Sequence, residues 1–201
     1  MTFPGYLHQS ATSAITTIPA TGIPGIYAVS FFINDQEDDP RRPTLTIGYN
    51  TEDRVQQVLT AQPGPGAARP SDAAEARWNY AFWLQNELTV IGDQTRDPAG
   101  ARLCEAWIKD NGWWLSEPDG NADEDWAPFL AAGEQITSNF VSLCVRMARQ
   151  LHADGVIKQT LGRHVPVLIH ELEYYNQIAD QTEDGNPPGL ADAFTTWIRN
   201  Q

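Results

Sequence analysis

The 201-residue chain is poor in cysteine: its two thiols, Cys104 and Cys144, both lie within helix-like patterns. Disulfide frameworks stabilise small secreted domains, and they need cysteines in suitably paired positions. Two separated thiols are more typical of a protein that stays in a reducing compartment. We therefore expect a cytoplasmic protein without a structural disulfide.

Long hydrophobic runs are missing as well. A membrane-spanning helix needs roughly 18 or more consecutive apolar residues, and no stretch of this chain approaches that length. Residues 1–20 have neither a basic start nor a continuous apolar core, so they do not resemble a secretory signal. The sequence therefore predicts no membrane partner and no export.

Basic residues are scarce, with 13 Lys and Arg against 26 Asp and Glu and a formal net charge of −13. An acidic surface repels nucleic acid and anionic lipid, so neither is expected as a partner. The same charge favours a basic protein partner. A net negative charge also keeps a protein in solution when it has no such partner. The charge therefore fits either a binding function or solubility alone.

Several motifs that carry chemistry are absent. The chain has no phosphate-binding glycine loop, no G-x-S-x-G element and no H-E-x-x-H motif. His170 and Glu171 begin like the last of these, but Tyr174 stands where the second histidine should be. Four histidines and two unspaced cysteines offer few zinc ligands. We therefore expect no metal and no cofactor.

What the chain does contain is a clear pattern of strands. Residues 26–33 and 44–49 are rich in β-branched and aromatic side chains, and the turn-forming segment 34–43 separates them. This pattern predicts an antiparallel hairpin. Residues 165–174 begin with a run that is apolar on both faces, which predicts a central strand covered on both sides.

Helical periodicity is strongest over residues 132–153, where apolar positions recur every three or four residues. Asp97 and Pro98 form a typical helix start, and residues 190–198 predict a terminal helix. Residues 75–87 fit a helix or a strand. We interpret 1–24 as an irregular N-terminal arm that has room for a short helix near residues 6–13. Residues 25–201 then form a single α+β domain, with a mixed or antiparallel sheet packed against several helices.

The end of the 165–174 strand gathers ionisable groups. On this strand Glu171 and Glu173 lie on one face about 7 Å apart, close enough for paired acid–base chemistry. With His170 they form a candidate catalytic set for a small hydrolase-like enzyme. The alternative is a strand that leaves the core here, so that these polar groups meet solvent or form salt bridges with Arg163 and Arg77.

A second candidate surface combines aromatic and acidic residues. Trp113 and Trp114 open a turn-rich loop that runs on to a group of carboxylates. Tyr174 and Tyr175 offer further aromatic anchors. Aromatic side chains often dominate the energetics of protein interfaces. The alternative is that the tryptophans close the edge of the core and the acids are solvated. The candidate binding residues are Trp113, Trp114, Asp123, Glu124, Asp125, Tyr174 and Tyr175.

Three blocks of the sequence carry a resemblance to a known family. They are GYNTED at 48–53, EARWNYAFWLQNE at 75–87, and VPVLIHELEYYNQIADQ with GNPP within 165–188. On these blocks the chain resembles the bacterial domain of unknown function 4303 family. The resemblance implies a single cytosolic α+β domain with no established activity and no catalytic residues to carry over. Its members look similar in style to small acidic immunity proteins found beside toxins.

Two hypotheses of function follow. The first is a non-catalytic acidic binding protein of toxin-immunity type that masks a basic protein partner. The second is the hydrolase-like enzyme with a site at His170, Glu171 and Glu173. The first predicts salt-sensitive capture of a basic protein, and the second predicts those three side chains converging in a cleft.

Overall fold

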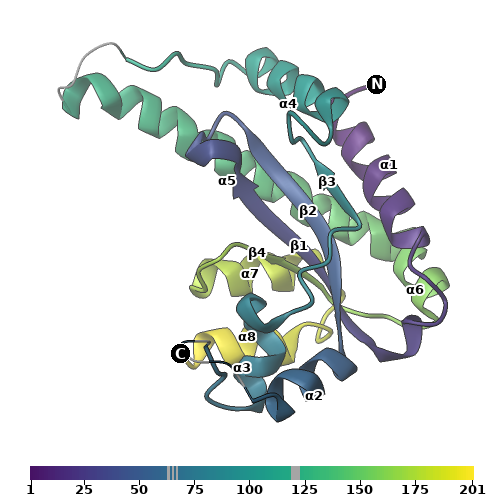
Figure 1. Cartoon of the computed structure of the whole chain (residues 1–201). Helices are drawn as coiled ribbons and strands as arrows, with labels where there is room; N and C mark the ends of the chain where they lie inside the picture. Colours follow the sequence, from purple (N-terminus) through teal and green to yellow (C-terminus); the bar gives the residue numbers. More distant parts are fainter. Residues whose placement is uncertain (63, 65, 67, 119–122) are drawn as a thin grey trace.

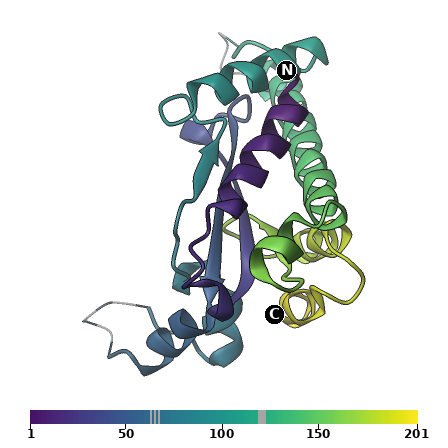
Figure 2. The same cartoon turned by 90° about the vertical axis from the view of Figure 1, so that its right-hand side faces the viewer.

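The computed structural model describes residues 1–62, 64, 66, 68–118 and 123–201, with the backbone alone at 123–125. It shows an α+β fold in one domain, with helices on both faces of a four-stranded mixed sheet (Figures 1 and 2). No helix among the described residues has the length and apolar character needed to cross a membrane. The elements in chain order are α1 Phe3–Thr16, η1 Ile23–Gly25, β1 Ile26–Asp35, η2 Gln36–Asp38, β2 Pro43–Thr51, α2 Glu52–Thr60, α3 Ala73–Trp78, η3 Tyr80–Phe82, β3 Thr89–Ile91, α4 Pro98–Asp110, α5 Asp123–Ala153, α6 Val156–Leu161, β4 Val167–His170, α7 Asn176–Gly185 and α8 Asp192–Arg199.

The sheet has the strand order β3-β2-β1-β4. The predicted hairpin is confirmed: β1 and β2 pair antiparallel along most of their length, from Ile26 opposite Thr51 to Asp35 opposite Pro43. β4 lies parallel to β1, with Val29 beside Val167. The carboxyl ends of β1 and β4 therefore meet at the same edge of the sheet.

The third predicted strand is shorter than expected. β4 ends at His170, so residues 171–174 are not part of the sheet and Leu172 is 68 % exposed. If the parallel register with β1 continued, Glu173 would lie beside Asp35. Like charges on neighbouring strands are destabilising, which gives a physical reason for the chain to leave the sheet here. The expected pairing of Glu171 and Glu173 on one strand face is therefore wrong.

The free edge of β4 is closed by side chains of α7. The amide of Asn186, at the end of α7, accepts from Val167 N at 2.8 Å and donates to Val167 O at 2.7 Å. Thr182 does the same for the backbone of Ile169, at 3.1 and 3.0 Å. A fifth strand is not needed, because these side chains satisfy the edge that it would have paired with.

The interpretation of residues 1–24 as an irregular arm is wrong, and the short helix allowed near residues 6–13 is part of a longer one. Most of the segment forms α1, capped by Thr2, whose hydroxyl accepts from Gly5 N at 3.4 Å. Phe3, Leu7 and Ile15 are buried on one side of this helix and belong to the larger core cluster. Their spacing of four and eight residues is helical, but alanine, serine and threonine between them weaken the amphipathic contrast.

The ambiguous segment 75–87 contains no strand. Residues 73–78 form α3, with Asp72 capping its start by accepting from Glu75 N at 2.8 Å, and a short 3-10 turn follows at 80–82. The alternation of Trp78, Tyr80 and Phe82 suggested a strand. In the structure Trp78 ends α3, and Tyr80 and Phe82 lie in the 3-10 turn that follows. Packing of the rings against their neighbours outweighs local strand propensity.

The long helix α5 is confirmed and extends further toward the N-terminus than the predicted 132–153. Its 31 residues span about 46 Å, and its first part runs beyond the sheet (Figure 1). Gly155, with a φ of 76°, turns the chain from α5 into α6, as the sequence predicts for a helix end at this position. α1, α4, α5 and α6 cover one face of the sheet. The second core cluster covers part of the other face.

Candidate functional site

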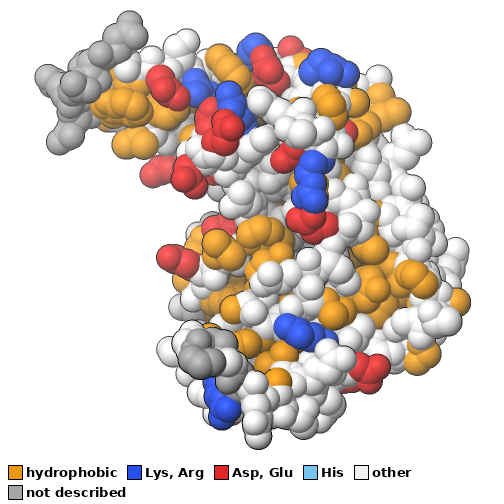
Figure 3. All heavy atoms as spheres, viewed as in Figure 1, with side chains coloured by type: hydrophobic (Ala, Val, Ile, Leu, Met, Phe, Trp, Pro, Cys, Tyr) orange, Lys and Arg blue, Asp and Glu red, His pale blue; other side chains and the backbone are white. Residues whose placement is uncertain are grey.

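A hollow of about 360 Å³ opens at the carboxyl ends of β1 and β4. Ligands of open α/β sheets often bind at the carboxyl ends of parallel strands, because the connections diverge there and leave a crevice. In the surface view the molecule is indented between the part that contains the start of α5 and the helices at the opposite end of the molecule (Figure 3). The hollow is lined by Ile33, Asn34, Asp35, Asp38, Thr137, Glu171, Leu172, Glu173 and Tyr175.

The charged side chains of this lining are all acidic. Asp35 ends β1, Asp38 lies in η2, and Glu171 and Glu173 follow β4. The topology thus gathers carboxylates from positions more than 130 residues apart in the chain. Among the described lining residues there is no lysine, arginine or histidine to neutralise them.

Asp35 is the carboxylate most affected by this arrangement. Burial, and then the negative charges of Glu171, Asp39 and Asp38, raise the pKa of Asp35 to about 6. Each cause disfavours the ionised form. An incoming cation would favour it instead, so a bound lysine or arginine side chain would lower this pKa.

One side of the hollow is apolar and exposed. Leu172 is 68 % exposed and Tyr175 is 42 % exposed. The hydroxyl of Tyr175 donates to Glu171 Oε2 at 3.2 Å, which positions the ring beside the carboxylates. Burial, followed by the charge of Glu171, raises the pKa of Tyr175, so the hydroxyl keeps its proton at neutral pH. The hollow therefore combines negative charge with an aromatic and aliphatic rim.

His170 does not join these carboxylates. It is fully buried and packs among the rings of Phe32, Tyr80 and Trp83. Its Nε2 lies 2.8 Å from Ser30 Oγ, and its Nδ1 lies 3.1 Å from the backbone oxygen of Glu171. The carbonyl can only accept, so Nδ1 carries the hydrogen and Nε2 accepts from Ser30.

This environment does not provide a general base. Burial lowers the pKa of His170 to about 4, with the backbone oxygen of Glu171 acting weakly in the opposite direction. Ser30, which is 4 % exposed, pairs with His170 as a nucleophile would, but both groups are buried away from any described cavity. The convergence of His170, Glu171 and Glu173 that the hydrolase hypothesis requires is not observed. The Ser30 partner had no signal in the sequence, because the two residues are 140 positions apart.

Of the predicted aromatic anchors, Tyr174 has a structural role. Its hydroxyl accepts from the backbone N–H of Tyr80 at 2.8 Å, and its ring packs edge-on against Phe194 and Trp197. Burial raises the pKa of Tyr174. Tyr174 therefore anchors the loop after β4 to α8, and only its neighbour Tyr175 faces the hollow.

The tryptophan pair is held in place by its neighbours. Trp113 is half-buried and packs edge-on against Trp107, with ring centroids 5.2 Å apart. Trp114 has the guanidinium of Arg41 at 5.5 Å and the ammonium of Lys109 at 4.5 Å from its ring centroid. The side chains of Asp123, Glu124 and Asp125 lie outside the described residues, although their backbone begins α5.

Asp35 and Asp38 were not among the predicted site residues. In the sequence they belong to an acidic, turn-rich segment and look like ordinary solvated residues of a hairpin connection. The signal that identifies them is topological: Asp35 ends the strand that pairs in parallel with β4, and Asp38 follows it closely. Among the described residues, no group of three or more histidine, cysteine, aspartate or glutamate side chains is arranged to hold a metal ion.

Comparison with known proteins returned no match to a family model, a curated protein or a solved structure. The resemblance to the domain of unknown function 4303 family therefore stays a prediction from the three sequence blocks.

Proposed function

We propose that the protein is a non-catalytic binding protein of toxin-immunity type that masks a basic protein partner in the cytoplasm. The observation that carries the proposal is the hollow at the carboxyl ends of β1 and β4, with four carboxylates and no basic residue in its described lining. A lysine or arginine side chain of the partner would supply the missing positive charge.

The rim of the hollow supports the same proposal. Leu172 and Tyr175 are exposed beside the carboxylates, so a partner that inserts a cation would also bury apolar surface around it. Tightly bound interfaces commonly surround a charged or aromatic anchor with contacts that exclude water. The net charge of −13 would steer a basic partner toward the protein and raise the association rate at low salt.

Capture of proteins from a lysate of the native host tests this proposal. The bait is the immobilised full chain, compared with a variant in which Glu171→Gln and Glu173→Gln remove two charges from the hollow. We expect wild type to retain a basic protein, to lose it as salt increases from roughly 50 to 500 mM, and to retain much less of it in the double variant.

A matched control separates the hollow from overall charge. Asp110→Asn with Asp192→Asn removes two exposed carboxylates that have no ion-pair partner among the described residues and do not line the hollow. This variant should retain the partner as wild type does. Capture that is equal in all three proteins and insensitive to salt would contradict the proposal.

A further inference from the structure

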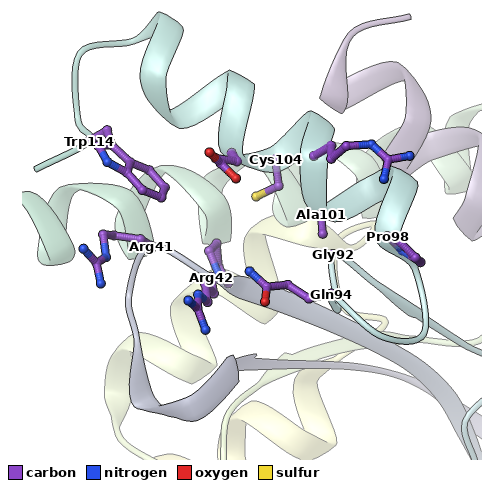
Figure 4. Close-up of a pocket in the computed structure, with 11 residues that line it drawn as sticks. Arg41, Arg42, Gly92, Gln94, Pro98, Ala101, Cys104 and Trp114 are labelled. Carbon is purple, nitrogen blue, oxygen red and sulfur yellow. The ribbon is translucent and has the colours of Figure 1, made fainter. Parts of the chain in front are cut away.

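A second pocket lies between α4 and the connection that joins β1 to β2. Its volume is about 190 Å³, smaller than the roughly 300 to 1,000 Å³ of sites for drug-sized ligands, so it suits a small group. Figure 4 shows Cys104 pointing down from α4, the side chain of Gln94 extending beneath it, and Arg41 and Trp114 together at one end. The pocket is lined by Arg41, Arg42, Pro43, Gly92, Gln94, Pro98, Ala101, Arg102, Cys104, Glu105 and Trp114.

The charge of this lining is opposite to that of the whole chain. Three arginines and one glutamate line the pocket, which gives it a formal charge of +2 on a chain of −13. Glu105, the one acid, is paired with Lys109 on the next turn of α4. The acidic hollow and this basic pocket flank the same connection, which carries Asp38 toward the first and Arg41 toward the second.

Arg41 forms a fixed wall of the pocket. Its guanidinium donates to both carboxylate oxygens of Asp39, at 2.8 and 2.9 Å, and to Glu117 Oε1 at 2.7 Å. The ring of Phe129 lies 5.1 Å from the same guanidinium. Arg41 thus holds the 113–117 segment against the hairpin and has little donor capacity left for a ligand.

The other polar groups of the lining do have free donors. Arg42 uses Nη1 for Glu37, at 2.5 Å, and Nε lies 3.4 Å from Asp39 Oδ2, which leaves Nη2 unused. Within the described part of the chain, the guanidinium of Arg102 has no hydrogen-bond or ion-pair partner. The side-chain amide of Gln94 also has no described partner.

We propose that this pocket binds a small oxyanion of the phosphate class, as inorganic phosphate or as a phosphate monoester. Arg42 supplies a charged donor and Gln94 supplies an amide donor, while Arg102 adds positive charge to the same lining from α4. Cys104, which is 3 % exposed, closes the pocket on the α4 side. Guanidinium groups are well suited to such anions because their donors match the spacing of the oxygens. This site is independent of the acidic hollow and does not require the proposed binding function.

Calorimetric titration of the full chain with inorganic phosphate, at pH 7.5 and constant ionic strength, tests the assignment. We expect saturable binding at one site, weakened about tenfold by Arg42→Gln, because that change removes charge-assisted hydrogen bonds. Adding Arg102→Gln should weaken it further, because a second positive charge leaves the lining. O-phosphoserine in a parallel titration distinguishes the sources: tighter binding than phosphate assigns a monoester, and equal or weaker binding assigns the free anion.

The control variant is Arg146→Gln, which removes an exposed arginine on α5 that has no described hydrogen-bond or ion-pair partner and does not line the pocket. It should bind phosphate as wild type does. Circular dichroism should show that both arginine variants fold, since Arg102 has no described hydrogen-bond or ion-pair partner and the ion pairs of Arg42 lie at the surface. Absence of saturable binding, equal affinity in the arginine variants, or acetate bound as tightly as phosphate would each overturn the assignment.

Discussion

At the scale of single residues, His170 and Asp35 show how burial controls charge at one edge of the sheet. They end neighbouring parallel strands, but His170 lies among aromatic rings while Asp35 lies in the acidic hollow. Burial is the largest cause of both pKa shifts, and in each case it favours the neutral form. A basic group and an acid that are both neutralised by burial have opposite effects on stability as pH changes.

For His170 the pKa is about 4 in the folded protein, compared with 6.5 for an ordinary histidine. Between these pH values the unfolded chain binds the proton that the folded chain refuses, so the contribution of His170 to the free energy of unfolding falls as pH falls from 6.5 to 4. The full loss is on the order of 3 kcal/mol. Replacing His170→Gln should flatten this part of the stability curve, measured by urea unfolding at several pH values. An unchanged slope would contradict the buried, neutral imidazole.

For Asp35 the sign is reversed. Its folded pKa of about 6 exceeds the ordinary 3.8, so its contribution to stability is fully present below pH 3.8 and is lost as pH rises through 6. Above pH 6 the ionised carboxylate is a cost. We therefore expect Asp35→Asn to raise the free energy of unfolding at pH 7.5 by about 1 to 2 kcal/mol, discounted for partial exposure, and to give no gain at pH 4. Urea unfolding at the two pH values checks this, with Asp110→Asn as the exposed control.

At the scale of elements, the sequence predicted the helices and strands that depend on capping, turn residues and apolar periodicity. The cap at Asp97, whose Oδ1 accepts from Gly100 N at 3.0 Å, and the regular apolar stripe of α5 identified two helices correctly. The hairpin was predicted because turn-forming residues separate two apolar runs. The acidic hollow could not be predicted in full, because it depends on β1 and β4 pairing in parallel across more than 130 residues, and periodicity contains no information about such pairing.

The closure of β4 by α7 gives a prediction at this scale. Asn186→Ala would leave the N–H and the carbonyl of Val167 without partners in the buried core. Each orphaned group costs about 1 to 3 kcal/mol, so we expect a loss of roughly 3 kcal/mol in the free energy of unfolding. Denaturant unfolding measures it, and Asn200→Ala at the exposed end of α8 is the control. A loss below about 1 kcal/mol would show that water replaces the amide at this edge.

At the scale of the whole molecule, the charge is unevenly distributed. The connection between β1 and β2 separates an acid-lined hollow from an arginine-lined pocket, and the chain as a whole carries −13. Several arginines are already committed to ion pairs with acids, among them Arg77 with Glu52 and Arg199 with Asp180. The carboxylates that remain unpaired therefore repel one another across the surface.

This repulsion predicts that salt stabilises the folded protein. At low ionic strength the compact state holds its negative charges closer together than the unfolded chain does, and screening reduces that cost. Loss of exposed ion pairs with salt is a smaller opposing effect, since such pairs contribute about 0 to 1 kcal/mol each. We expect Tm to rise by several degrees, about 3 to 6 °C, between roughly 10 and 300 mM NaCl at pH 7.5.

A variant with three fewer negative charges separates this effect from general salt effects on hydration. Asp110→Asn, Glu134→Gln and Asp192→Asn remove exposed carboxylates without described ion-pair partners. The variant should have a higher Tm than wild type at low salt and should gain less as salt is added, because less repulsion remains to be screened. Equal salt dependence in the two proteins would show that repulsion is not the cause. The effect would then arise in the apolar core, because salt also strengthens the burial of apolar surface. A Tm that falls with salt would instead show that the ion pairs dominate.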